Sequence, residues 1–158
     1  MSTKQIIFKL GDEEYGMDIS LVTTIEKYAG VVPMPNAPMH IIGILSLRGD
    51  VIPVYSLRKK FGMPEVTASD KTQLLITRCK DILVGYKVDS VSEIIELEDN
   101  EVQPVPTIVR CAETRYALGV TNKKSRMVVL LDLENILNEQ EAEAVKDFAE
   151  QNEKKSGE

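Results

Sequence analysis

The pattern of apolar and polar positions predicts short β-strands along most of this chain. In Gln5–Leu10, the side chains of Ile6, Phe8 and Leu10 fall on one face, the two-residue period of a half-buried strand. Turn residues separate it from other short apolar runs: Ile44–Leu47, Val51–Tyr55, Leu74–Ile76, Ile82–Val84, Ile94–Leu97, Tyr116–Thr121 and Met127–Leu131. About eight to ten such strands are typical of antiparallel sheets that form barrels or a sandwich.

Helical signals are few and short in the first half of the chain. Asp18 can cap a helix in which Ile19, Val22 and Ile25 share one stripe, so a short helix is predicted there. Residues 38–43 begin with proline and end with glycine, which predicts a single helical turn.

The C-terminal part is predicted to be helical. Asp132 can cap a helix over Leu133–Leu137, and Asn138 with Glu141 resembles a capping box that starts a second helix. Residues 151–158 are charged and lack apolar anchors, which predicts a disordered tail.

The segment 43–62 is the most informative part of the sequence. Its two apolar runs flank Arg48, Gly49 and Asp50, which predicts a β-hairpin in which the glycine supplies the positive φ of the turn. Ser56 then occupies the N-cap of a short helix that Gly62 ends. Arg48 is left at the turn, where its guanidinium is suited to binding a partner. A solvated turn arginine is the alternative.

Length and composition indicate one domain. The chain has 158 residues and an ordinary hydrophobic content of 43%. No apolar run approaches the ~20 residues of a membrane-spanning helix, and the N-terminus has no apolar signal region. We therefore expect a cytoplasmic protein, in which Cys79 and Cys111 are reduced.

The charge and the polar residues exclude several classes of function. A net charge of −6 argues against nucleic acid, which requires a clustered basic face. His40 is the only histidine, neither cysteine lies in a CxxC motif, and there is no glycine-rich phosphate loop. We expect no catalytic residues, no metal and no cofactor. A β protein without catalytic apparatus is most simply a binding module.

Several segments resemble one family. Residues 43–62 are similar to the pattern Gly-x-x-x-Leu-Arg-Gly-x-x-Ile/Val-Pro-Val/Ile-x-Asp-Leu-Arg-x-x-Phe-Gly of the CheW family of chemotaxis coupling proteins. Residues 11–19 resemble the first hairpin of that family, residues 84–95 its central strand pair, and residues 126–133 its last strand. These matches have the order and spacing of the family and together span about residues 5 to 138.

The resemblance implies a fold and a domain division. It implies a mainly β fold of two five-stranded, SH3-like barrel subdomains that share an apolar interface, with short helices and a C-terminal helix. We expect a single CheW-like domain over residues 1–150, with the crossover between its halves near residues 63–72, followed by the tail at 151–158.

The resemblance also implies a function. Members of the family are non-catalytic adaptors that couple methyl-accepting chemotaxis receptors to the histidine kinase CheA. The regulatory domain of the kinase docks on one barrel, and a groove between the barrels takes the cytoplasmic tip of the receptor. Contact with the membrane is then only indirect, through receptors, and the protein is expected at receptor arrays. A CheW-like scaffold for a non-motility signalling kinase, or a competitor for array sites, is the alternative.

The family positions can be transferred residue by residue. Arg48 matches the functional arginine at the hairpin turn, and Gly43 and Gly49 match the glycines that shape the hairpin. Val22 and Ile25 match apolar positions assigned to partner contact, although packing in the core would also suit Ile25.

The chain departs from the family pattern at two positions. Thr24 stands where a glutamate is common, so a charged contact with a partner would be absent or replaced there. Ser56 replaces the usual aspartate before Leu-Arg, and both residues are good N-caps.

Overall fold

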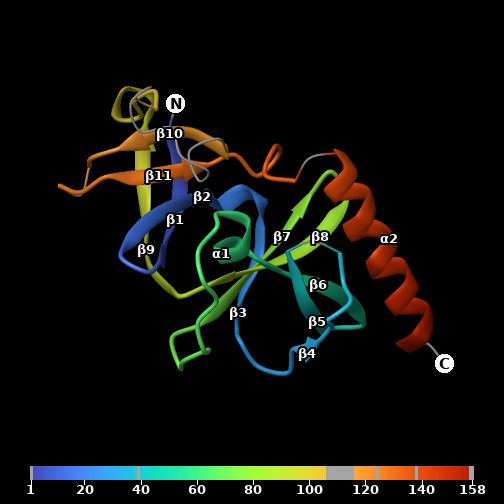
Figure 1. Cartoon of the computed structure of the whole chain (residues 1–158). Helices are drawn as coiled ribbons and strands as arrows, with labels where there is room; N and C mark the ends of the chain where they lie inside the picture. The colour runs from blue at the N-terminus through green and yellow to red at the C-terminus, as the bar shows by residue number, and fades with distance from the viewer. Residues whose placement is uncertain (1, 39, 106–115, 124, 138, 157–158) are drawn as a thin grey trace.

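The computed structural model describes residues 2–38, 40–105, 116–123, 125–137 and 139–156 (Figure 1). The predicted mainly β architecture is confirmed. The strands and helices are β1 (Ser2–Leu10), β2 (Glu13–Asp18), η1 (Ile19–Leu21), β3 (Val22–Lys27), β4 (Val32–Pro33), β5 (Ile41–Leu47), β6 (Asp50–Ser56), α1 (Leu57–Lys60), β7 (Gln73–Cys79), β8 (Ile82–Val88), β9 (Ser90–Glu98), η2 (Asp99–Glu101), β10 (Ala117–Thr121), β11 (Val128–Leu131) and α2 (Glu139–Ser156).

The strands form two sheets, consistent with two SH3-like subdomains. The first subdomain has the order β10-β11-β2-β1-β9, and the second has the order β3-β7-β8-β6-β5-β4. The second sheet has six strands instead of the predicted five, because the two-residue strand β4 pairs with β5. In Figure 1 the first sheet lies at the upper left, and the second lies below it and to its right, beside α2.

The apolar side chains divide into clusters that explain this arrangement. The predicted face of β1, with Ile6, Phe8 and Leu10, belongs to the largest cluster, which contains buried residues of both sheets and is the shared apolar interface. Ile7 points the other way, into a cluster confined to the first subdomain. A third cluster, which includes Leu74, lies within the second subdomain.

The chain crosses between the sheets at other places than the sequence predicts. The loop at 63–72, where the crossover was expected, connects α1 to β7 within the second subdomain. The crossings lie after β2, through η1, at Asp89 between β8 and β9, and after β11. Asp89 is the single residue between two strands of different sheets, so no turn composition marks the crossing.

The helix predicted after Asp18 is wrong beyond its first turn. Asp18 does accept a hydrogen bond from the Ser20 N–H, as expected of a cap, but the helical part is only η1. Val22 and Ile25 lie in β3, which pairs antiparallel with β7. The β-branched side chains of this segment favour a strand, and pairing with a neighbouring strand overrides the helical spacing.

The short helices predicted at residues 38–43 and 133–137 do not form among the described residues. His40 has φ of 71°, outside the right-handed helical region, and β5 begins at the next residue, so Gly43 lies inside a strand. Residues 133–137 form turns instead of a helix. Asp132 accepts hydrogen bonds from the Glu134 N–H and the Asn135 amide, and this local bonding competes with helix formation.

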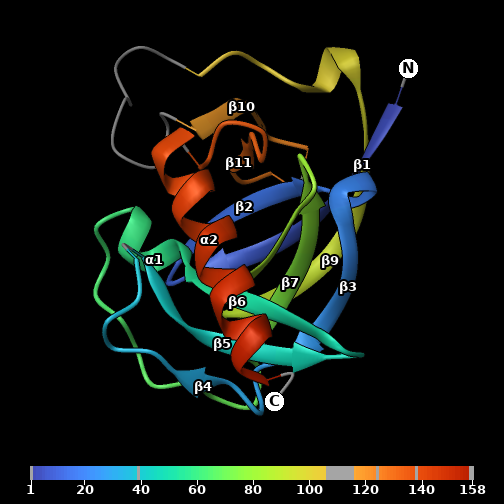
Figure 2. The same cartoon turned by 90° about the vertical axis from the view of Figure 1, so that its right-hand side faces the viewer.

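Helix α2 lies across the second sheet, in front of β6 in Figure 2. Val145 anchors it and is almost fully buried, whereas Asn138, the predicted cap, lies outside the described residues. Residues 151–156 continue the helix where the sequence predicts disorder, because Gln151, Glu153, Lys154 and Lys155 favour helices and the segment has no glycine or proline. Within the described part of the chain, neither helix has the length and apolar composition needed to cross a bilayer.

Candidate partner-binding surface

Arg48 lies in a tight turn at the end of the predicted hairpin. Strands β5 and β6 pair from Ile41↔Tyr55 to Leu47↔Asp50, which leaves Arg48 and Gly49 as a two-residue loop. Their φ angles are 51° and 87°, as a type I′ turn requires. The predicted hairpin is therefore confirmed. The structure adds that the backbone of Arg48, like that of Gly49, is in the left-handed region.

This conformation makes Arg48 a candidate for function. A left-handed φ costs an L-residue roughly 1–2 kcal/mol, and asparagine or glycine is the usual solution in such turns. The Arg48 side chain is exposed and has no hydrogen bond or ion pair with the residues that the structure describes. The turn therefore leaves the Arg48 guanidinium exposed and available to a partner.

The two glycines of the hairpin act in different ways. A Cβ at Gly43 would lie 2.5 Å from the Val32 carbonyl oxygen, so Gly43 allows β4 to approach β5 closely. A Cβ at Gly49 would meet nothing within 4 Å, so only its positive φ demands glycine.

The three β3 positions differ in their surroundings. Val22 is half-buried and packs against the apolar interface between the sheets. Thr24 is half-buried and its hydroxyl donates to Glu26 Oε1 at 3.2 Å. Ile25 is 36% exposed and belongs to none of the apolar clusters. Of these three residues, Ile25 is therefore the one with an apolar side chain available to a partner.

A cavity of about 630 Å³ brings the end of β3 next to the hairpin. We call it the hairpin groove; its lining includes Glu26, Lys27, Val32, Ile44, Leu47 and Val51. Val32 is 53% exposed, and β3, β4 and β5 gather in the lower part of Figure 1. Ile25 and Arg48 directly adjoin lining residues in sequence, whereas Val22 and Thr24 do not line the groove.

An ion pair fastens the crossing at Asp89. The Arg58 guanidinium donates to both carboxylate oxygens of Asp89, at 3.0 and 2.5 Å, and the Gly11 N–H donates to the same carboxylate at 2.7 Å. Burial raises the pKa of Asp89, but the hydrogen bonds from Arg58 and Gly11 outweigh it, so the pKa lies below its ordinary value. Asp89 is therefore held ionised.

A second polar cluster surrounds Glu141 of α2. Its carboxylate lies 2.5 Å from Lys60 Nζ, 2.7 Å from the Tyr55 hydroxyl and 3.3 Å from His40 Nδ1. Burial raises the pKa of Glu141, but the bonds from Lys60 and Tyr55 outweigh burial and lower it overall. The Lys60 ammonium also lies 4.6 Å from the centre of the Tyr116 ring.

The His, Cys, Asp and Glu side chains form no metal site among the described residues. No group of three or more His, Cys, Asp or Glu side chains there could hold a metal ion. His40 is engaged with Glu141 and Tyr55, and Cys79 is a half-buried free thiol whose pKa is raised by burial. Cys111 lies outside the described residues.

Known proteins match this chain along most of its length. The family described as CheW-like domain matches residues 4–141. This chain belongs to the CheW family. Chemotaxis protein CheW from Rhizobium meliloti is 32% identical over 139 residues, which cover 88% of this chain and 90% of that protein. Chemotaxis protein CheW from Klebsiella aerogenes is 34% identical over 144 residues, covering 91% and 87%.

A solved structure extends the match to the fold. The crystal structure of the scaffolding protein TtCheW from Thermoanaerobacter tengcongensis is similar with a TM-score of 0.78 and 30% sequence identity. The similarity covers 87% of this chain and 89% of that one. The resemblance to the CheW family and the fold that it implies are therefore confirmed.

Sequence reasoning missed most of the residues that line the hairpin groove. Lys27, Val32 and Leu47 lie in three different strands, and only the curvature of the second sheet brings them together. No sequence motif links these residues, since each is a single residue of a different short strand. Arg58 and Asp89 were visible only as parts of the family motifs.

Proposed function

We propose that this CheW-family protein is a non-catalytic adaptor that couples methyl-accepting chemotaxis receptors to a CheA-type histidine kinase. It would act on the cytoplasmic side of the membrane and would reach the membrane only through the receptors. Its contribution is geometric: it holds kinase and receptor in a fixed arrangement, so that movement of the receptor changes the activity of the kinase.

The observation that carries the proposal is Arg48, an exposed arginine with a left-handed backbone conformation, next in sequence to a residue that lines an apolar groove. An arginine can donate several hydrogen bonds in a fixed fork, and the groove supplies apolar area for a partner to bury. By contrast, the side chains of Tyr55, His40 and Lys60 in the same subdomain are engaged with Glu141.

We assign the hairpin groove to the regulatory domain of the kinase. Strands β3 and β4 are the two ends of the second sheet, and their outer edges suit contact with another β domain. Arg48 and Ile25 flank this region. The receptor tip, a helical hairpin, would bind elsewhere, along the junction of the two subdomains, by laying an apolar helix face into it.

Weak contacts suffice for such a protein. Interfaces at the small end of the standard size range are commonly of micromolar affinity. In an array, each molecule is held by several contacts at once, and effective concentration then supplies the strength that one contact lacks.

Isothermal titration calorimetry tests the proposal. The protein is titrated into the regulatory domain of the CheA-type kinase from the same genome, with Arg48→Glu and Lys59→Glu variants in parallel. Lys59 is exposed, carries the same charge and lies beyond the opposite end of β6, so it controls for the change in net charge.

We expect saturable one-to-one binding that Arg48→Glu weakens at least about tenfold and Lys59→Glu leaves nearly unchanged, a difference of about 1.4 kcal/mol. Equal weakening by both variants would show that net charge, and not the hairpin, governs binding. No binding between two folded proteins would contradict the assignment of the kinase as a partner.

A further inference from the structure

Helix α1 binds residues at or next to two of the places where the chain crosses between the subdomains. Leu57 and Phe61, at the start of this helix and just after it, are buried in the apolar interface between the sheets. Arg58 and Lys60 leave the same short helix and bind partners on two different crossing segments. Lys59, between them, is exposed and its side chain has no contact with a described residue that would fix it.

The contacts of Arg58 join three segments. Its guanidinium binds both oxygens of Asp89 at the crossing from β8 to β9, and it also donates to the Pro64 carbonyl oxygen at 2.8 Å. Asp89 in turn accepts from the N–H of Gly11 in the β1–β2 turn, and its own N–H donates to the Lys9 carbonyl oxygen at 3.0 Å. One side of the interface is thus tied from the second subdomain to the first.

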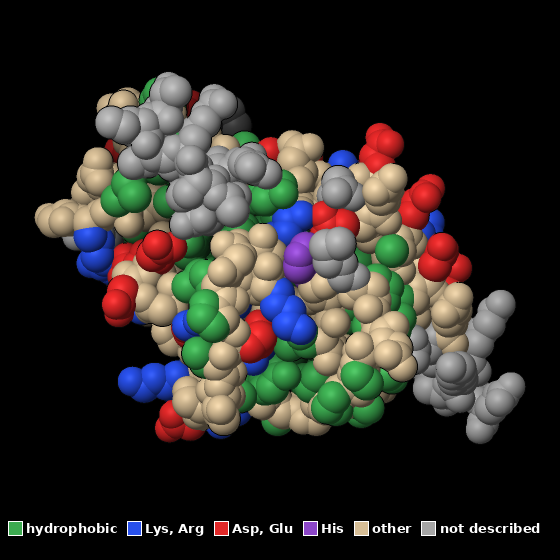
Figure 3. Space-filling view, in the orientation of Figure 1, with side chains coloured by type: hydrophobic (Ala, Val, Ile, Leu, Met, Phe, Trp, Pro, Cys, Tyr) green, Lys and Arg blue, Asp and Glu red, His purple; other side chains and the backbone are tan. Residues whose placement is uncertain are grey.

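The contact of Lys60 fixes the start of α2, which follows the last crossing, on the second subdomain. The chain leaves β11 of the first sheet and returns to the second sheet as α2, where Glu141 in the first turns meets Lys60. The side chains of Lys60 and Glu141 are only 5% and 12% exposed. In Figure 3 the histidine of this cluster, in purple, lies at the surface beside basic and acidic side chains.

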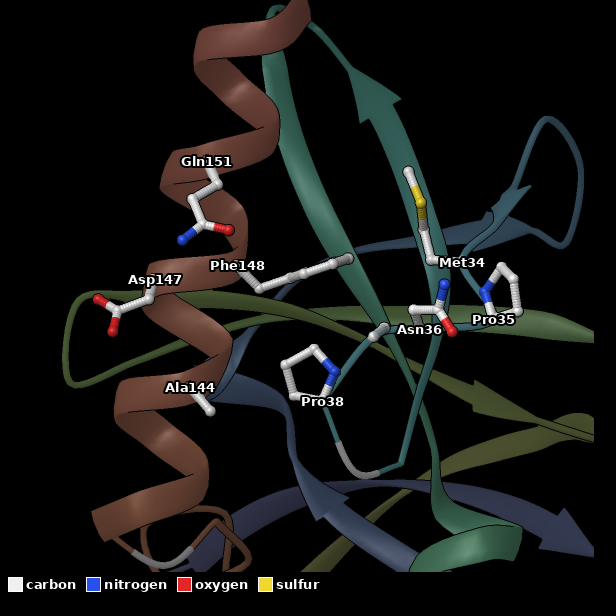
Figure 4. A pocket seen from close by; sticks show the side chains of 9 residues that line it. Met34, Pro35, Asn36, Pro38, Ala144, Asp147, Phe148 and Gln151 are labelled. Atoms are coloured by element: carbon white, nitrogen blue, oxygen red, sulfur yellow. The ribbon is translucent and has the colours of Figure 1, made fainter.

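Helix α2 is held by both apolar and polar contacts, with Val145 buried in the largest apolar cluster. Cavities of about 590 and 690 Å³ flank the helix, the first between α2 and residues 34–38. Figure 4 shows Phe148 reaching from α2 toward the strands while Asp147 points away. The Glu141 cluster adds polar contacts at the N-terminal end of α2.

The charged pairs add contacts of defined geometry to the apolar interface between the sheets. The driving force for burial of apolar surface is non-directional. A two-pronged Arg–carboxylate pair has a defined geometry, and buried charged pairs can select one arrangement among several of similar packing energy.

We propose that Arg58 and Lys60 are positioning residues, which fix the relative orientation of the two subdomains. Arg58 acts through Asp89 at a crossing. Lys60 holds Glu141, where the chain has reached the second subdomain, and lies over the ring of Tyr116, which directly precedes β10 of the first. Each subdomain keeps its own apolar cluster without them, but the angle between the sheets is no longer fixed. That this angle sets the arrangement of kinase and receptor rests on the proposed function; the angle itself can be measured without either partner.

Pulsed electron–electron double resonance on the full chain tests the proposal, because it measures the distance between two spin labels. Spin labels are placed at the exposed positions Ser46 on β5 and Ser92 on β9, one on each sheet, after Cys79 and Cys111 are replaced by serine. The variants are Arg58→Gln and the double variant Lys60→Met with Glu141→Gln. The double variant removes both charges together, which avoids leaving one buried charge unpaired. Lys59→Gln is the matched control.

We expect one narrow distance peak for the parent protein and for Lys59→Gln. Arg58→Gln and the double variant should shift or broaden that peak by several ångströms, while circular dichroism shows native strand content. Arg58→Lys, which keeps the charge but loses the two-pronged geometry, should give an intermediate width. It serves as the test if Arg58→Gln fails to fold.

An unchanged peak in the folded double variant and in a folded Arg58 variant would overturn the proposal. The outcome does not depend on kinase binding: the distance result can fail while calorimetry still shows the kinase complex. Equally, the orientation can be confirmed for a protein that does not bind the kinase.

Discussion

Replacement of Arg48 by asparagine should make the protein more stable while weakening its binding. Arg48 holds a φ of 51° in a two-residue turn, followed by Gly49 at 87°. Asn-Gly is the favoured sequence for a type I′ turn, because asparagine tolerates the left-handed region. The penalty for an ordinary L-residue there is roughly 1–2 kcal/mol. If asparagine recovers about half of that penalty, the free energy of unfolding rises by about 0.5–1 kcal/mol. No contact of Arg48 with a described residue is lost in exchange.

Urea denaturation followed by circular dichroism measures this difference. The variant should unfold at higher urea concentration with an unchanged slope, since the surface exposed on unfolding is the same. Arg48→Lys is the control, because lysine gains nothing in the left-handed region. Calorimetry with the kinase domain should show weaker binding for Arg48→Asn. If Arg48→Asn lowered stability by more than about 0.5 kcal/mol, beyond the usual range for a surface change, Arg48 would be structural and the argument from strain would be refuted.

Three further predictions concern other parts of the structure. Gly49→Asn should lower the free energy of unfolding little, and Gly49→Ala should lower it by about 1 kcal/mol. At Gly43, asparagine should be no better than alanine, because a backbone oxygen blocks any Cβ. Urea midpoints that rank the two substitutions alike at both sites would contradict this. Leu74→Ala should lose about 2–5 kcal/mol, since this side chain is fully buried, and a loss below about 1 kcal/mol would place it outside a packed core. The folded pKa of Asp89 lies below its unfolded value, so its stabilisation is complete above its ordinary pKa of 3.8 and is lost as pH falls through the folded pKa. Urea midpoints measured from neutral to acidic pH should therefore fall less steeply for Asp89→Asn than for the parent; equal slopes would show that Asp89 does not contribute.

The strands and the hairpin could be predicted from the sequence because their signals are local. The alternation at Ile6, Phe8 and Leu10 identifies the face that the structure buries between the sheets. The turn at Gly49 and the cap at Ser56, which accepts from the Lys59 N–H, follow from the conformational needs of single residues. Such features depend little on the rest of the chain.

Features that depend on tertiary pairing could not be predicted in this way. Val22 and Ile25 have helical spacing, but β7 provides a partner for the segment, and a strand forms. The crossing at Asp89 has no loop, so nothing in the local composition marks it, while the conspicuous polar loop at 63–72 joins strands of one sheet. The hairpin groove likewise exists only after β3 and β5 approach in space.

The same limit applies to the candidate site. The family pattern pointed to Arg48, and the structure supplies a physical reason, an exposed guanidinium on an unfavourable backbone. The pattern did not distinguish Val22, which packs against the interface between the sheets, from Ile25, which is exposed, because burial is a property of the folded chain.

Reconstitution of receptor, kinase and this protein tests the central claim most directly. Phosphorylation by the CheA-type kinase is measured with receptor-containing membranes, with and without this protein, and before and after addition of a receptor ligand. The adaptor account predicts that the ligand changes kinase activity only when this protein is present, and that Arg48→Glu impairs this control while Lys59→Glu does not. Full ligand control of the kinase in the absence of this protein would contradict the account.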